Sequence, residues 1–126
     1  MTSSLYDPRY HQGIEHFNEC DFFEAHEVWE ELWQDDQSPS RRFYQGLIQV
    51  AVCLHHFGNG NTRGARKLYY SCQKYLDDYR PVHMGLNVEQ LLQQLQTCCT
   101  EILNSPEDFP KVELLVDLIP EIHLET

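Results

Sequence analysis

The segment from Phe43 to Phe57 is apolar around nearly its whole helical circumference, and this feature constrains the fold more than any other. Such a helix is stable only when neighbouring elements cover it on almost every side. Its apolar positions are Tyr44, Leu47, Ile48, Val50, Ala51, Val52, Cys53 and Leu54. Gln45, Gln49 and His56 form the narrow polar strip that remains. The sequence therefore predicts a helical protein with this segment as its central and most buried helix.

Capping residues and helix-breaking residues predict four further helices around the central one, with Asp7, Asn61 and Asn87 expected to begin the first, fourth and fifth helices of the chain. Asp21, with Glu24 three residues later, is expected to begin the second helix with a capping box. The four helices are expected over residues 8–19, 21–34, 61–80 and 87–104. We therefore expect a single all-α domain over residues 1–126, with a compact bundle of about five helices from about residue 8 to residue 104.

The C-terminal residues, from about 105 to 126, follow a different pattern. Pro110 and Pro120 bracket an apolar stretch, which predicts an extended arm, with a short helix over Lys111–Leu118 as the alternative. Its apolar side chains are too many to leave in water. Because twofold dimers are the commonest closed assembly, we expect a homodimer with Phe109–Leu124 in the contact. The alternative is an arm that folds back onto its own bundle.

Composition and charge exclude several classes of protein. The 126 residues include 20 Asp and Glu against 9 Lys and Arg, and a net charge of −11 disfavours nucleic acid and anionic membrane surfaces as partners. The longest uninterrupted apolar run, Val50–Leu54, is too short to span a membrane, and no signal peptide is indicated. The 5 cysteines contain no C-x-x-C motif, which predicts reduced thiols and a cytoplasmic protein.

A histidine and a glutamate stand together on the predicted second helix. His26 and Glu30 lie about 40° apart at the rim of its apolar face, where residues at i and i+4 are neighbours. His55 is expected to enter the core from the central helix, where a buried imidazole needs a polar partner. We expect these three side chains to converge on one semi-buried pocket between the two helices, with Gln45 or Gln49 beside them.

Several chemistries fit this pocket. Two histidines and a carboxylate can bind zinc or iron(II), so His26, Glu30 and His55 are candidate ligands of a divalent metal ion. The H-E-x-x-H motif of zinc proteases is absent, however. The alternatives are a structural hydrogen-bond network and a pocket for a small molecule or a protein partner. Nucleophilic catalysis has little support, because Cys53 lies on the buried helix, where a thiol is inert.

Residues 22–33 read FFEAHEVWEELW, and this segment closely resembles the signature of a prokaryotic family, domain of unknown function 309. Residues 45–55, 60–65 and 84–87 resemble later parts of the same family, so that the resemblance covers roughly residues 8–103. It implies a small all-helical bundle and no particular activity. The motif positions that it implies are His26, Glu27, Glu30, Trp33, Gln45, Gly46, His55 and Gly64. The resemblance thus adds Glu27 and Trp33 to the pocket, although the helical wheel directs Glu27 to solvent.

Two classes of function remain. The first is a non-catalytic binding or assembly module, which the acidic surface, the absence of a complete catalytic motif and the apolar arm favour. The second is a metal-dependent hydrolase or related enzyme that uses the same pocket. We favour the first class.

Overall fold

The computed structural model describes residues 5–107 and 110–125. Five α-helices make up most of it: α1 (Pro8–Asn18), α2 (Phe22–Asp35), α3 (Arg41–Gly58), α4 (Thr62–Leu76) and α5 (Val88–Asn104). The smaller elements are the 3₁₀ turns η1 (Asp77–Tyr79) and η2 (Val116–Leu118) and the strands β1 (Val82–His83) and β2 (Leu86–Asn87). The prediction of an all-α bundle of five helices is confirmed. Within these residues, no helix combines the length and the apolar character that crossing a membrane requires.

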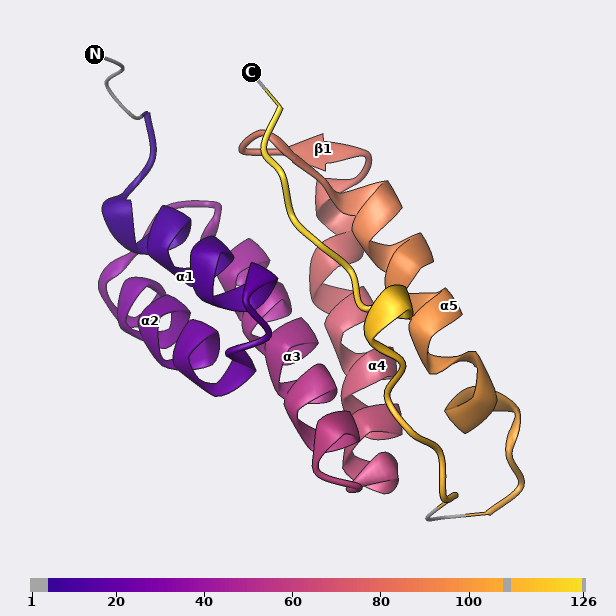
Figure 1. Cartoon of the computed structure of the whole chain (residues 1–126). Helices are drawn as coiled ribbons and strands as arrows, with labels where there is room; N and C mark the ends of the chain where they lie inside the picture. The colour runs from indigo at the N-terminus through magenta and orange to yellow at the C-terminus, as the bar shows by residue number, and fades with distance from the viewer. Residues whose placement is uncertain (1–4, 108–109, 126) are drawn as a thin grey trace.

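Helix α3 lies between α2 and α4, with α1 packed against α2 and α5 against α4 (Figure 1). It buries more residues than any other helix of the described chain. These residues are Phe43, Tyr44, Gly46, Leu47, Ile48, Val50, Ala51, Cys53, Leu54 and Phe57. The prediction of a central third helix is therefore confirmed, and core side chains pack against α3 from α2 on one side and from α4 on the other.

Two glycines let helices approach closely on either side of the core. A Cβ atom on Gly13 of α1 would lie 2.0 Å from Nε1 of Trp29 on α2. A Cβ atom on Gly46 of α3 would lie 2.5 Å from Cδ2 of Leu76 on α4. Both helix pairs therefore depend on a missing side chain at the point of contact.

A small β-hairpin connects α4 to α5, and the sequence analysis did not predict it. Strands β1 and β2 pair antiparallel, and Val82 lies opposite Asn87 in the register. Met84 and Gly85 at the turn both have positive φ, at 49° and 74°, which is the backbone of a type I′ turn. The carbonyl of Gly85 accepts a hydrogen bond of 2.7 Å from the backbone N–H of Glu125, so the hairpin contacts the end of the C-terminal arm.

The C-terminal arm, residues 110–125, is extended apart from η2, so a helix over Lys111–Leu118 is wrong except for that turn. The arm runs between α1 and α5 over its own bundle (Figure 1). Its contacts include a hydrogen bond of 2.9 Å from Oγ1 of Thr62 to the carbonyl of Pro110, and the side chain of Ile122 is buried. The fold-back alternative is therefore the arrangement in this structure, and the homodimer stays a prediction. Phe109, which the prediction placed in the contact, lies outside the described residues.

Candidate functional site

His26 and Glu30 form the expected pair on α2. Nε2 of His26 lies 3.0 Å from Oε2 of Glu30, as the i, i+4 spacing predicts, and both side chains are partly exposed. The other ring nitrogen, Nδ1, lies 3.3 Å from the carbonyl oxygen of Phe23. Both ring nitrogens of His26 therefore face an oxygen atom of the same helix, and a metal ion would have to displace one of these contacts.

His55 does not enter the core, and that expectation is wrong. It is half-buried on the last turns of α3, near the start of α2. Its Nε2 lies 3.2 Å from Nδ2 of Asn59, and the centroid of its ring lies 5.6 Å from that of Phe23. The same Phe23 ring lies 5.5 Å from the His26 ring, so an exposed aromatic ring contacts both histidines. The pKa of the next residue, His56, is lowered mainly by burial and to a lesser extent by the neighbouring His55.

Of the other predicted pocket residues on α2, Glu27 lies beside the His26–Glu30 pair, and Trp33 lies outside the depression that they line. Glu27 is exposed, as the helical wheel indicated, and with His26 and Glu30 it lines a depression of about 370 Å³ that is formed by α2 residues alone. Trp33 lies under the guanidinium of Arg41, whose Cζ is 4.1 Å from the ring centroid.

Gln45 and Gln49 are half-buried on α3. The side-chain oxygen Oε1 of Gln49 is buried and has no hydrogen-bond partner among the residues that the structure describes. Neither glutamine lines the α2 depression. The shared pocket between α2 and α3 therefore stays a prediction.

An apolar groove of about 300 Å³ lies where the α1–α2 turn, the end of α3 and the arm meet. His55 is the one predicted site residue in its lining. The apolar lining residues include Phe22, Leu54, Leu114, Val116 and Ile119. The sequence analysis missed this groove, because the path of the arm over the bundle depends on contacts between residues far apart in the sequence.

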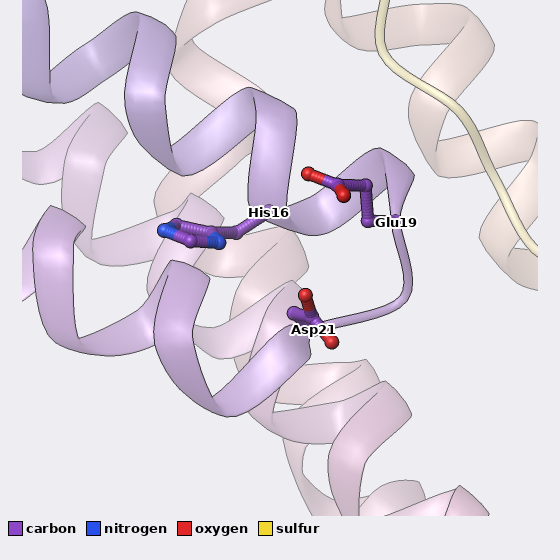
Figure 2. Close-up of side chains that lie close together, drawn as sticks. All are labelled: His16, Glu19 and Asp21. Carbon is purple, nitrogen blue, oxygen red and sulfur yellow. The ribbon is translucent and has the colours of Figure 1, made fainter.

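A third group of side chains gathers at the α1–α2 turn. His16, Glu19 and Asp21 each offer one ligand atom, and these three atoms lie within 4.8 Å of one another. Figure 2 shows His16 on α1 and the two carboxylates on the turn that follows it. No other set of three His, Cys, Asp or Glu residues in the described ranges meets this distance. His26, Glu30 and His55 do not meet it, and their role as metal ligands stays a prediction.

The buried thiols have no features of catalytic nucleophiles. All five cysteines are free, and only Cys20 is exposed. Burial raises the pKa of Cys72 to about 12. A hydrogen bond with Cys99 and then burial raise the pKa of Cys98. The thiols of Cys72 and Cys98 are therefore protonated at neutral pH, and a protonated thiol is a poor nucleophile.

Part of the chain matches a known protein family. Residues 10–68 match the model of a family described as "Domain of unknown function (DUF309)". The segment 10–68 belongs to the DUF309 family. The matched range extends from α1 into α4 and includes every predicted pocket residue. The hairpin turn at residues 84–87, which was expected to resemble the family, lies outside the match.

Two relatives show how far the similarity extends beyond the DUF309 range. The "Uncharacterized protein YpuF" of Bacillus subtilis (strain 168) is 38% identical over 85 residues, which are 65% of this chain and 49% of the relative. An "Uncharacterized protein" of Aquifex aeolicus (strain VF5) is 31% identical over 96 residues, which are 72% of this chain and 28% of the relative. The chain thus spans about half the length of the first relative and less than a third of the second.

Proposed function

We propose that this DUF309 protein is a non-catalytic assembly module that forms a twofold homodimer through the apolar groove between the α1–α2 turn, α3 and the arm. The observation that carries the proposal is the exposure of large apolar side chains beside the groove. The side chain of Val116 is 76% exposed, and those of Leu115 and Phe23 are 51% and 47% exposed. Contiguous exposed apolar surface on a small protein marks an interaction site.

The shape of this surface favours a second copy of the same chain as its occupant. Val116 and Leu115 protrude next to a concave groove, so one face carries both a projection and a recess. This combination suits an isologous interface, because the same surface of each subunit must fit the other.

Charge also favours self-association at this position. The protein carries a net charge of −11, so most approaches of two copies bring carboxylates together. Among the residues that the structure describes, no Asp, Glu, Lys or Arg side chain lines the groove. The lining itself therefore adds no carboxylate to a contact between two copies, although Asp21 and Glu121 lie near Cys20 at its edge. The proposal includes a cytoplasmic location, where the five free thiols stay reduced.

Light scattering after gel filtration at micromolar concentration tests the proposal. We expect the full chain to be a dimer and Val116→Glu to be a monomer, because the new carboxylate would have to enter the apolar contact. Val82→Glu is the matched control, since Val82 is also exposed, at 43%, but lies on the hairpin. A monomeric wild-type chain would overturn the proposal, and a dimeric Val116→Glu variant would remove the groove from the interface.

A metal-dependent hydrolase at His26, Glu30 and His55 has less support, because both ring nitrogens of His26 already contact an oxygen atom. The purified, untagged protein can be analysed for metal. If it holds stoichiometric zinc, iron or manganese, and if His26→Ala loses this metal, the hydrolase would be favoured over the assembly module.

A further inference from the structure

The backbone at the end of α1 reverses sharply and carries three ligand side chains with it. The N–H of Asp21 donates a hydrogen bond of 2.8 Å to the carbonyl of His16, and the N–H of Cys20 donates one of 3.0 Å to Phe17. Cys20 has a φ of 64°, in the left-handed region. These bonds fix the spacing of His16, Glu19 and Asp21 whether or not anything binds between them.

The imidazole of His16 carries a polar atom that the protein leaves without a partner. Its Nδ1 is buried and has no hydrogen bond within the described part of the chain. Buried nitrogen atoms in folded proteins nearly always have a partner, so an exception needs an explanation. A bound cation next to the ring would provide one.

The two carboxylates are also uncommitted. Asp21 is the N-cap residue of α2, but its side chain makes no cap hydrogen bond, so the expected capping box is wrong. Within the described residues, neither Glu19 nor Asp21 has a side-chain hydrogen bond or ion pair. Both are exposed and can change rotamer without disturbing the core.

We propose that His16, Glu19 and Asp21 bind a divalent first-row transition-metal ion, with zinc as the reference case. The donor set is one imidazole nitrogen and two carboxylate oxygens, which suits zinc, iron(II) or manganese(II), and the imidazole disfavours calcium and magnesium. The three ligand atoms now lie within 4.8 Å of one another. To bind one ion at metal–ligand distances of about 2.0–2.2 Å, they have to be closer together than this. Rotation of the exposed carboxylates provides this movement, and water completes the coordination shell.

The charge of the site matches its proposed ligand. Two carboxylates and a neutral imidazole balance a dication, and the net charge of −11 concentrates cations near the surface. The bound ion would join the end of α1 to the start of α2. Zinc should therefore stabilise the folded chain, because a ligand that binds only the native state raises its apparent stability. The groove lining includes Cys20 but none of His16, Glu19 and Asp21, so the metal ion and the second copy would contact different side chains and either proposal can fail alone.

Calorimetric titration of the untagged full chain with zinc chloride tests the proposal. We expect one zinc ion per chain at this site, with affinity reduced more than about tenfold in Asp21→Asn, in Glu19→Gln and in His16→Gln, since even loss of an outer-shell partner costs about that much. Asp21→Asn is the most informative variant, because asparagine keeps the N-cap preference and the shape of the side chain. Glu30→Gln is the matched control, since it alters the other His–Glu pair of this region.

Thermal melting provides a second readout that does not depend on counting ions. Zinc should raise the melting temperature of the wild type and of Glu30→Gln, and leave that of Asp21→Asn unchanged. Cobalt(II) should give a spectrum without a thiolate charge-transfer band, which shows that Cys20 is not a ligand. Equal zinc affinity in the wild type and Asp21→Asn would overturn the proposal. So would the absence of binding at millimolar zinc, or a loss of binding in Glu30→Gln instead.

Discussion

The side chain of Asn18 forms two hydrogen bonds with the backbone of Ile122: Nδ2 donates to the carbonyl at 2.8 Å, and Oδ1 accepts from the N–H at 2.8 Å. One amide side chain at the end of α1 therefore satisfies both polar groups of an arm residue whose own side chain is buried. This pairing reproduces one step of a β-ladder without a second strand. It fastens the arm to the bundle close to the α1–α2 turn.

Asn18→Ala should destabilise the protein by about 1–3 kcal/mol, because it leaves the N–H and the carbonyl of Ile122 without partners. Urea denaturation measures the loss of stability. Asn18→Ala should also increase the hydrogen-exchange rate of the Ile122 amide more than the exchange rates of the amides in α3. Asn104→Ala, at an exposed residue, is the control and should change stability little. An unchanged Ile122 exchange rate in Asn18→Ala would contradict the role given to this amide.

Gly13→Ala should cost about 3 kcal/mol or more, because its Cβ would lie 2.0 Å from Nε1 of Trp29. The same clash would disturb the hydrogen bond of 3.3 Å from Nε1 of Trp29 to the carbonyl of Tyr10. Denaturant melts that are followed by tryptophan fluorescence measure the change. Gly58→Ala is the comparison, since its Cβ would meet Leu114 at an ordinary 3.6 Å. Equal stability of the two variants would show that α1 and α2 can separate without cost.

Stability should fall with acidification below about pH 6.5, in part through His83. Its ring lies 4.7 Å from Phe43 and 4.6 Å from Tyr79, and burial lowers its pKa below the usual 6.5. The unfolded chain therefore binds more protons than the folded chain as pH falls through the unfolded value, so protonation favours unfolding. Above about pH 7 this contribution is fully present.

The matched measurement is the slope of unfolding free energy against pH between pH 5 and pH 7. It should be smaller in His83→Gln than in the wild type, because glutamine does not titrate. Asn104→Ala alters an exposed residue that carries no titratable group and should keep the wild-type slope. A His83→Gln slope equal to that of the wild type would show that the ring titrates normally.

Only Cys20 should react with a thiol reagent such as Ellman's reagent in the native protein at pH 8, because the other cysteines are buried. Burial, and then Asp21 and Glu121, raise the pKa of Cys20, so its reaction should be slower than that of a small free thiol. Denaturant should release the remaining reactivity, and Cys20→Ser should have none until it unfolds. Fast reaction of a second thiol in the folded protein would mean that the core opens locally.

The fold was predictable where local signals determine it. Asp7, Asn61 and Asn87 all cap the helices that they were expected to begin, because a cap depends only on the next few residues. The central place of α3 followed from its apolar circumference. The hairpin escaped prediction because its strands are two residues long, and because Met84 at positive φ is an uncommon turn residue.

The candidate sites were predictable only in part. The His26–Glu30 pair followed from spacing within one helix, and this spacing survives whatever packs around it. The position of His55 did not follow, because a helical wheel gives the direction of a side chain but not which turns of the helix are covered. The His16 group escaped because it depends on the backbone reversal at Cys20, a non-glycine residue with φ of 64°.

The arm also determines the order in which this molecule must form. Asn18 and Ile122 are 104 positions apart, so their contact closes almost the whole chain into a loop. The helices around α3 form from neighbours in the sequence, whereas a closure of this length is entropically expensive until they are in place. The arm should therefore dock after the folding transition state. Changes in it should then accelerate unfolding while leaving the folding rate nearly constant, so that a segment outside the helical bundle governs how long the native protein lasts.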